Sequence, residues 1–531
     1  PIDGEKLLEF KRCLVHFAVG TEQVFMTTRL DGRKTRFFPF NVCYANEKLS
    51  IKGYKTSYLW EDVLRRESIL DLIQNYISLQ TNEELEYNEK TRKLDTKKST
   101  ALIFPRYHQR RAVHKIVKDV KENGAGKRYL IQHSAGSGKS NTITWLAFRL
   151  SSLYQHYTDE KALYDSVLVV TDRKVLDNQL QANLRQFDLT PGEVAYIDDK
   201  CSAQDLKKAI ESRKRIIVST LQKFPVISET ISMFPDRNYA VIIDEAHSSQ
   251  SGDAARHMRK ALSLSEAEVF DKAVEEEEDI DKLVEAEIEK KGFKKNISFF
   301  AFTATPNPKT KELFCERING KKEPFDEYSM EDAINEGFIL DVMDNYMSFK
   351  RYYKLIKKAD IPDEEYEKKK TVRLLSNFVD LQDTAIERKA RIMIEHFEAQ
   401  TSKEIQGKAR AMLVTRSRLH AVRFKRKFDD IMREMRLPYS ALVAFSGSVK
   451  DAETGEEYTE ASMNNLSGKF SIPEALKLPQ YRFLIVANKY QTGFDEPLLH
   501  TMFVDKKLGG TSTVQTLSRL NRTKKGKEST M

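Results

Sequence analysis

The feature that most constrains the fold is a series of short apolar runs, rich in β-branched and aromatic residues, that alternate with helical stretches. Such runs predict strands buried on both faces, and strands that alternate with helices are typical of a parallel, doubly wound sheet. The first group of runs comprises Tyr129 to Ile131, Val167 to Val170, Ile216 to Val218, Val241 to Ile243 and Phe299 to Phe302. The second group comprises Ala411 to Val414, Leu442 to Phe445, Phe483 to Val486 and Met502 to Val504. We therefore expect two α/β domains in tandem.

The segment before these runs has a different pattern. Residues Val24 to Thr28 and Arg36 to Phe40 alternate as strands do, and Val63 to Leu79 has a helical period. The polar, lysine-rich stretch from Glu83 to Ser99 predicts a linker. A chain of 531 residues is too long for one core. We expect the remnant of an α+β domain and its linker over 1–95, a first α/β domain over 96–325 and a second over 326–531.

Composition narrows the class of protein. The net charge of +9 and the pI near 9.0 favour a polyanionic partner. No run of 18 apolar residues occurs, so the sequence predicts no membrane span. The four cysteines, Cys13, Cys43, Cys201 and Cys315, lie too far apart to form a CxxC zinc or redox motif. We expect reduced core thiols in a cytoplasmic protein. The acidic run from Ser263 to Lys295 predicts a pair of solvated surface helices.

The strongest local signal is a small-residue loop between a strand and a helix. Gly136-Ser137-Gly138-Lys139-Ser140 follows the run at Leu130 and precedes a helical stretch from Asn141 to Ser152. Small residues let backbone N–H groups close around phosphate oxygens at a helix N-terminus. Lys139 would neutralise the β and γ phosphates of ATP, and Ser140 would ligate Mg²⁺. The pattern departs from the full motif at one position, because His133 stands where the first glycine would fall.

A second signal is the strand from Val241 to Ile243, which ends in Asp244 and Glu245. A carboxylate at Asp244 suits the coordination sphere of Mg²⁺, and Glu245 can polarise the attacking water as a general base. His247 would sense the nucleotide state and couple it to neighbouring motifs. Together with the small-residue loop, these residues predict hydrolysis of Mg·ATP.

The ordered motifs resemble those of superfamily 2 helicases and translocases. The resemblance rests on Asp244-Glu245-Ala246-His247 followed by Thr303-Ala304-Thr305-Pro306, and it implies two RecA-like (P-loop NTPase) domains. It assigns Thr303 and Thr305 to coupling between ATP state and domain movement, and Gln109, in Tyr107-His108-Gln109, to the adenine edge. Further residues would contact a nucleic-acid backbone. These are Thr171, Arg173, Ser219, Thr220, Lys223, Thr415, Arg416 and Thr492.

Two segments of the second domain resemble further motifs of that superfamily. Gln491-Thr492-Gly493-Phe494-Asp495 is similar to its T-G-x-D element, which implies nucleotide contacts from Gly493 and Asp495. Gln515 to Arg522 is similar to its Q-x-x-x-R-x-x-R element, which implies catalytic roles for Gln515, Arg519 and Arg522. If this stretch is helical, Arg519 and Arg522 share a face and can reach phosphates bound by the first domain. Arginine fingers of this kind make hydrolysis depend on domain closure.

The flanking segments resemble the restriction/translocation (R) subunit of type I restriction-modification enzymes. The similar stretches are Phe10 to Arg12 continuing to Arg36 through Asn41, Asn335 to Val342, and Lys489 to Asp495. The resemblance implies an ATP- and Mg²⁺-dependent motor that translocates double-stranded DNA before cleavage, together with methyltransferase and specificity subunits. It also implies an N-terminal nuclease core and a C-terminal helical region, and we expect this chain to be a fragment that lacks most of both. Glu9-Phe10-Lys11 spells E-x-K, but its spacing leaves no room for the usual strand between metal ligands.

Other functions remain open at this stage. The chain could be another DNA motor of superfamily 2, such as a type III restriction subunit or a remodeller, and an intact upstream nuclease would discriminate between them. A general RNA helicase is disfavoured by the flanking resemblance alone. An ATP-binding scaffold that does not turn over is also open, but such a scaffold has no need of the base at Glu245 or of the arginines at 519 and 522.

Overall fold

The computed structural model describes most of the chain. The described residues are 5–42, 53–88, 90–156, 158–171, 174–187, 192–197, 201–220, 223–244, 295–306, 308–318, 321–343, 383–451, 455–466, 470–491, 493–524 and 526–531. The acidic run from Ser263 to Lys295, for which the sequence predicts surface helices, lies almost wholly outside the described residues.

By packing, the chain divides into two compact units. The first contains residues 1–82 and 100–338, and the second contains residues 83–99 and 339–531. Each unit is built around a parallel sheet, which confirms the predicted α/β fold class with two RecA-like sheets.

The sheet of the first unit has seven strands, all parallel to their neighbours. In spatial order they are β14 (Asp326–Tyr328), β6 (Arg128–His133), β11 (Ile297–Thr303), β10 (Tyr239–Asp244), β7 (Ser166–Thr171), β9 (Ile216–Thr220) and β8 (Val194–Ile197). Five of them contain the apolar runs of the first group, so those strand predictions are confirmed. β8 and β14 are additional.

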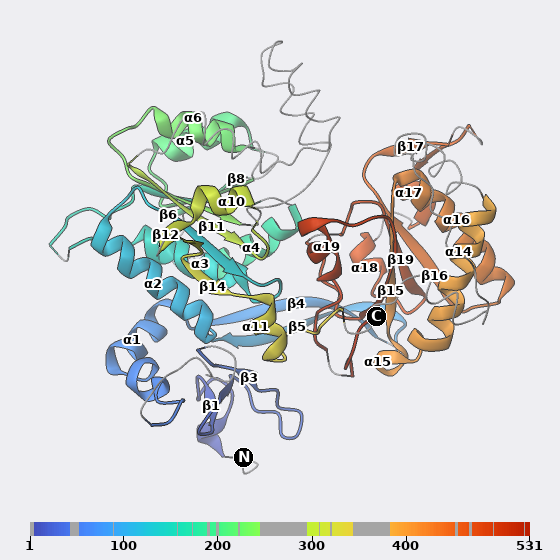
Figure 1. Ribbon diagram of the computed structural model, residues 1–531, viewed down its shortest axis with the longest axis horizontal. Coiled ribbons are helices and arrows are strands. Elements are labelled where there is room, and N and C mark those ends of the chain that lie inside the picture. Colours follow the sequence, from blue (N-terminus) through green and yellow to red (C-terminus); the bar gives the residue numbers. More distant parts are fainter. Residues whose placement is uncertain are drawn as a thin grey trace. The chain divides into compact units, whose positions relative to one another are not determined.

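Helices cover both faces of this sheet (Figure 1). One face packs against α2 (Tyr107–Asn123), α3 (Lys139–Ser151) and α4 (Lys174–Phe187), and the other packs against α5 (Ala203–Glu211), α6 (Phe224–Ser232) and α10 (Pro308–Phe314). Because side chains alternate along a strand, Val167 and Val169 enter the first core, whereas Leu168 and Val170 enter the second. Burial on both faces explains why these strands have no polar alternation. The unit also contains α11 (Met330–Asn335) and a small antiparallel pair, β12 (Glu316–Ile318) and β13 (Lys321–Glu323).

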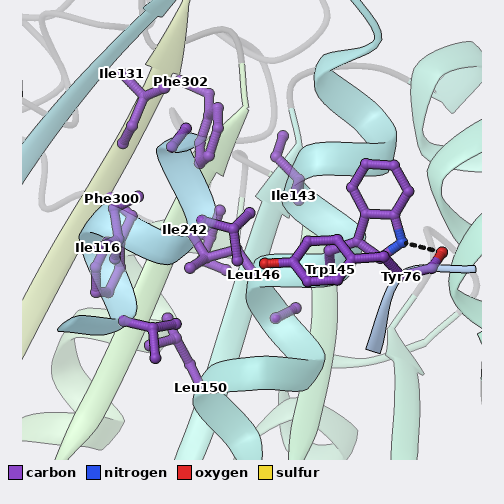
Figure 2. Close-up of a cluster of buried hydrophobic side chains, with 14 of the residues drawn as sticks. Tyr76, Ile116, Ile131, Ile143, Trp145, Leu146, Leu150, Ile242, Phe300 and Phe302 are labelled. Atoms are coloured by element: carbon purple, nitrogen blue, oxygen red, sulfur yellow. Dashed lines mark hydrogen bonds between the residues drawn. The ribbon is translucent and has the colours of Figure 1, made fainter. Parts of the chain in front are cut away.

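The N-terminal segment shares the first of these cores. It comprises η1 (Lys6–Leu8), the antiparallel strands β1 (His16–Val19), β2 (Val24–Thr27) and β3 (Phe38–Pro39), a short π-helical turn η3 (Leu59–Val63) and α1 (Arg66–Asn75). Figure 2 shows Tyr76 beside Trp145 of α3, whose indole Nε1 donates to the Tyr76 carbonyl oxygen at 3.0 Å. Leu146 of α3 and Ile242 of β10 belong to the same cluster. The segment therefore packs as part of the first unit.

A two-stranded ribbon replaces the predicted linker. β4 (Ser78–Asn88) pairs with β5 (Lys93–Ile103), so the prediction of a linker from Glu83 to Ser99 was wrong. Most side chains of β5 are exposed, and a ribbon with two solvated faces has no apolar alternation by which the sequence could reveal it.

The second unit has a four-stranded parallel sheet in the order β16 (Ser440–Ala444), β19 (Tyr481–Val486), β15 (Arg410–Thr415) and β20 (Leu499–Asp505). β15, β19 and β20 contain their predicted runs of the second group, and the run from Leu442 to Phe445 extends one residue beyond the end of β16. The remaining elements are α14 (Asp383–His396), η5 (Phe397–Thr401), α15 (Glu404–Gly407), α16 (Arg418–Glu434), β17 (Ser448–Lys450), β18 (Glu457–Thr459), α17 (Glu460–Asn464), α18 (Ile472–Ala475) and α19 (Gly510–Leu517). One face of the sheet packs on α14 and α16, and the other on α18.

Two properties bear on the sequence predictions. Among the described residues, no helix has the length and apolar character that crossing a membrane requires. Cys13, Cys201 and Cys315 are half-buried thiols outside any disulfide, and Cys201 and Cys315 pack against the second core of the first unit without being fully buried in it. Cys43 lies outside the described residues.

Candidate nucleotide-binding site

Five neighbouring strands of the first sheet end at one edge. Because the strands are parallel, their carboxyl ends bring together residues that are far apart in the sequence. The last residues of β6, β11, β10, β7 and β9 are His133, Thr303, Asp244, Thr171 and Thr220. The small-residue loop follows β6 at this edge, so the sequence-predicted loop and the Asp244 carboxylate lie on the same side of the sheet.

The loop turns sharply into α3 by way of two glycines in the left-handed region. Gly136 has φ +84° and Gly138, the N-cap of α3, has φ +85°. A side chain at either position would be strained. At Gly138 a Cβ atom would also lie 2.6 Å from Nε2 of Gln109. The glycines are therefore needed both for the turn and for the close approach of Gln109.

Residues at the start of α2 hold this loop in place. Gln109 Nε2 donates to the Gly138 carbonyl oxygen at 3.0 Å, and Gln109 Oε1 accepts from the backbone N–H of Arg106 at 2.8 Å. His108 Nε2 lies 3.2 Å from the Ser137 carbonyl oxygen. Burial, with a further contribution from the charge of Arg106, lowers the pKa of His108 well below its ordinary value. The neutral imidazole can thus donate to the loop.

His133, at the position of the missing first glycine, is completely buried. Its Nε2 lies 3.0 Å from Oδ1 of Asp326 in β14, and Arg111 donates to both carboxylate oxygens of Asp326 at 2.9 Å. Burial lowers the pKa of His133, so a neutral imidazole donates this hydrogen bond. Burial alone would raise the pKa of Asp326, but the hydrogen bond from His133 and the charge of Arg111 hold it below its ordinary value.

The loop presents groups that fit an anion. The side chains of Ser134 and Ser137 are 1% exposed, and neither hydroxyl has a hydrogen-bond partner among the described residues. Lys139 is largely buried behind the loop, with Nζ 3.5 Å from the His133 carbonyl oxygen. Ser140 is half-buried in the first turn of α3. Buried hydroxyls and an ammonium group at a helix N-terminus are what a phosphate group requires.

Of the two acidic residues predicted for the site, only Asp244 lies within the described residues. Asp244 is buried at the end of β10, next but one to β6 in the sheet. Glu245 and His247 lie outside the described residues. In the adjacent strand, Thr303 is fully buried and its hydroxyl accepts from the backbone N–H of Thr305 at 3.2 Å. The Thr305 hydroxyl is buried without a partner among the described residues.

The candidate nucleic-acid contacts differ in exposure. Thr171, Ser219 and Thr220 are buried at strand ends, and Lys223 donates to the Cys201 carbonyl oxygen at 2.9 Å. In the second unit, Thr415 donates to the Val486 carbonyl oxygen at 3.0 Å. Arg416 is exposed, and its Nε lies 3.3 Å from the Asp505 carbonyl oxygen. Arg173 and Thr492 lie outside the described residues. The nucleic-acid roles stay predictions.

The two candidate arginines lie beyond a helix rather than on it. α19 ends at Leu517, so the helical condition for a shared face of Arg519 and Arg522 is not met. Arg519 contacts the T-G-x-D segment, because its Nη1 donates to the Phe494 carbonyl oxygen at 2.8 Å. Arg522 pairs with Asp495 of the same segment at 3.0 Å.

The other candidate residues described in the second unit, Gly493 and Gln515, belong to the same two motifs as Asp495 and Arg522. Gly493 has φ +70°, a conformation that suits glycine and lets the chain turn before Phe494. Gln515 accepts from the Arg519 guanidinium through its backbone carbonyl, and its side-chain Oε1 is buried without a partner among the described residues. The two second-domain motifs are therefore one connected cluster of residues.

Sequence reasoning missed the polar network beneath the loop. Arg106, Asp326, Tyr328 and Glu336 are buried and bonded to one another or to the loop-supporting residues. The one available signal was His133, because an imidazole in place of a glycine at a strand end needs a partner in the core. No sequence pattern identifies that partner as Asp326.

Two family models match the chain. Residues 108–270 match the SWI2/SNF2 ATPase, and residues 339–530 match domain 3 of the type I restriction enzyme subunit R. The "Putative type I restriction enzyme MjaIXP endonuclease subunit" of Methanocaldococcus jannaschii is 27% identical over 455 residues, which cover 82% of this chain and 38% of that protein. The type I restriction enzyme HindI endonuclease subunit of Haemophilus influenzae is 25% identical, with coverage of 92% and 43%.

A solved fragment of a "putative HsdR subunit of a type I restriction enzyme" from Vibrio vulnificus is 15% identical and covers 97% of this chain and 74% of its own. Its TM-score of 0.45 is too low to support a functional comparison.

The two parallel sheets, the loop and the ATPase match define an ATPase of the superfamily 2 class. The match to domain 3 and the curated relatives confirm the second resemblance: this chain is a homologue of the R subunits of type I restriction enzymes. It spans well under two thirds of the length of the two curated relatives described above.

Proposed function

We propose that this chain binds Mg·ATP at the 134–140 loop and hydrolyses it to move along double-stranded DNA, as the motor part of a type I restriction R subunit. The observation that carries the proposal is the pair of buried hydroxyls at Ser134 and Ser137, which have no hydrogen-bond partner among the residues that the structure describes, together with the largely buried Lys139 at the start of α3. Polar groups buried in a glycine-bounded turn at a helix N-terminus are favourable only if a ligand completes their hydrogen bonds.

ATP and Mg²⁺ fit the residues that surround this loop. Lys139 would neutralise the β and γ phosphates, while Ser140 and Asp244 would hold the metal ion. The ion supplies charge neutralisation on the phosphates when it is bound. Glu245 would take the proton of the attacking water, and Gln109, besides fixing the loop, is the candidate contact to the adenine edge.

We propose catalytic or nucleotide-contacting roles for residues of the second unit as well. Arg519 and Arg522 are the proposed arginine fingers, and such an arginine changes the rate by about 10³- to 10⁵-fold. Gln515, Gly493 and Asp495 would contact the nucleotide or orient the arginines. His247, Thr303 and Thr305 would transmit the state of the γ phosphate.

The proposed polymer is duplex DNA, and the net charge of +9 supports a polyanionic partner. Backbone contacts would come from the exposed Arg416, and from Arg173, Lys223 and Thr492, with the hydroxyls of Thr171, Ser219, Thr220 and Thr415 at the strand ends. We propose that methyltransferase and specificity subunits select the site in the cytoplasm and that cleavage belongs to the whole R subunit.

A triplex-displacement assay tests translocation. A third strand is placed on a duplex downstream of the recognition site, and this chain is added with the methyltransferase and specificity subunits. We expect ATP-dependent release of the third strand by the wild type and none by Lys139→Ala. Release that is equal without ATP, or equal in Lys139→Ala, would rule out ATP-driven movement.

A further inference from the structure

The chain passes between the two units at three places, 82/83, 99/100 and 338/339. At the last of these, the joining segment 336–340 is bonded on both sides of the boundary. On the first side, the Glu336 carboxylate is 3% exposed and accepts from the Tyr328 hydroxyl at 2.6 Å and from Arg106 Nη2 at 3.0 Å. The Arg106 guanidinium also lies 3.7 Å above the ring of Phe338, the last residue of the unit. The end of the first unit is thus fixed to Arg106.

The same network reaches the nucleotide loop by two routes. The Tyr328 ring stacks on His108 with centroids 3.9 Å apart, and His108 contacts the Ser137 carbonyl oxygen. Arg106 donates its backbone N–H to Gln109, which holds Gly138. Every link is a hydrogen bond or a stacked ring, and the side chains of Arg106, His108, Gln109 and Tyr328 that form them are buried, so we expect a displacement of the loop to be passed to this network.

Two of the segments that carry the resemblance to the R subunit meet at Phe338, beside Arg106. Phe338, from the 335–342 segment, contacts Phe38, from the 36–41 segment, at 6.2 Å between centroids. Arg106 lies over the ring of Phe338. These flanking residues belong to no nucleotide-binding motif. Because they converge beside the loop, they contribute to its support.

On the second side of the boundary, the joining segment is bonded to the arginine cluster. The Leu340 backbone N–H donates to the Asn521 carbonyl oxygen at 3.0 Å. Asn521 is completely buried and stands between Arg519 and Arg522 in the sequence. The neighbouring Leu520 carbonyl oxygen accepts from Nζ of the buried Lys527 at 2.7 Å. Leu340 is therefore attached to a fixed backbone within the candidate arginine motif.

We infer that residues 336–340 couple the nucleotide loop to the arginine segment 518–522, and that Glu336 is the positioning residue of this coupling. Glu336 and Leu340 are four positions apart, so at most about 14 Å of chain lies between their Cα atoms. Glu336 must follow Arg106, because separating them would leave a buried charge without a partner. Nucleotide binding that displaces the loop and α2 then moves the backbone that carries Arg519 and Arg522. The inference rests on the proposed binding and hydrolysis of ATP.

Hydrogen–deuterium exchange with and without Mg·AMP-PNP tests the coupling. Three regions are followed: the loop at 134–145, the joining segment at 336–342 and the arginine segment at 516–522. We expect AMP-PNP to change exchange in all three regions of the wild type. In Glu336→Gln, which keeps the shape but removes the charge that pairs with Arg106, the loop should respond as in the wild type. The response of 516–522 should fall at least threefold.

Two further variants and one kinetic readout complete the design. Tyr328→Phe removes one hydrogen bond to Glu336 and keeps the ring, so we expect an intermediate loss. Glu327→Gln, at an exposed position in the same strand, should match the wild type. In steady-state hydrolysis, Glu336→Gln should lower kcat about fivefold or more and change KM for ATP less than twofold.

The outcomes separate this inference from the proposed function. A wild-type loop that does not respond to AMP-PNP would contradict nucleotide binding and the coupling together. A loop that responds while 516–522 does not, or a response at 516–522 that Glu336→Gln and Tyr328→Phe leave at full size, would overturn the coupling alone.

Discussion

Gln109 Nε2 lies 3.0 Å from the carbonyl oxygen of Gly138, and the left-handed turn at that glycine is what allows the approach. The amide is therefore a support of the loop before any nucleotide binds. Preorganised loops bind tightly because less ordering is needed at the moment of binding.

Gln109→Ala should weaken nucleotide binding without unfolding the chain. The loss of one buried hydrogen bond to the loop corresponds to about 1 to 1.5 kcal/mol, or roughly tenfold in Kd for a fluorescent ATP analogue. Lys118→Ala, at an exposed position of the same helix, is the control and should bind as the wild type does. Equal Kd values for Gln109→Ala and the control would contradict the support role.

Stability should depend on pH through His133. The pKa of His133 in the folded chain lies below the ordinary value of 6.5 that it has in the unfolded chain. Once the pH falls to about 6.5, the imidazole therefore takes up a proton when the chain unfolds. The contribution is complete above about pH 7 and is lost as the pH falls, by up to about 1.4 kcal/mol per pH unit. His133→Gln keeps a donor for Asp326 and cannot titrate. Urea unfolding between pH 7.5 and 5.5 should therefore give a shallower pH slope for this variant.

The control for this measurement is His156→Gln, in a surface turn, which should keep the wild-type slope. A slope in His133→Gln as steep as in the wild type would show that protonation of His133 is not linked to folding. The depressed pKa of Asp326 acts at more acidic pH, because its stabilisation is lost only as the carboxylate is protonated.

Substitution of Trp145 tests whether the N-terminal segment and the first sheet share one core. Trp145→Phe removes the hydrogen bond to the Tyr76 carbonyl oxygen and leaves space in the core, which should cost about 2 kcal/mol in the free energy of unfolding. Trp60→Phe, 48% exposed, should cost less than about 0.5 kcal/mol. Chemical unfolding followed by circular dichroism gives both values. Equal effects of the two substitutions would contradict a shared core.

We expect the substitutions of Arg519 and Arg522 to differ in their effects on Tm. Arg519→Ala removes a bond to the Phe494 backbone and should lower the Tm. Arg522→Ala removes only an exposed pair with Asp495, which contributes little to stability, so its Tm should stay near the wild-type value. As a proposed finger, Arg522→Ala should nevertheless keep ATP binding and lose hydrolysis by about 10³-fold. An equal loss of nucleotide affinity in Arg522→Ala and Lys139→Ala would contradict the finger assignment.

The sequence predicted the elements whose burial leaves a pattern. Val167 to Val170 reads as a strand because both of its faces are covered, and the loop at 136–140 is recognisable because its backbone needs glycine. β14 was missed because Asp326 and Glu327 leave no apolar run, although the strand pairs with β6. The ribbon of β4 and β5 was missed because its exposed side chains resemble those of a linker.

The candidate site was predictable residue by residue but not as a set of contacts. The chemistry of Lys139 follows from its residue type at a helix N-terminus after a glycine-bounded turn, and that of Asp244 from its residue type at a strand end. The pairing of Arg106 with Glu336 joins residues 230 positions apart, and no local pattern encodes it. The bond from Arg519 to the Phe494 carbonyl oxygen likewise joins two motifs that are far apart in the sequence, and no local pattern encodes it.

The most direct test of the central claim is steady-state Mg·ATP hydrolysis with no nucleic acid, duplex DNA, single-stranded DNA or duplex RNA, using Lys139→Ala as the control. The account predicts that duplex DNA raises the wild-type rate at least about tenfold over no nucleic acid, that duplex RNA does not, and that Lys139→Ala is inactive throughout. Stimulation by RNA alone would contradict it, as would no turnover with duplex DNA both without and with the assembled methyltransferase complex.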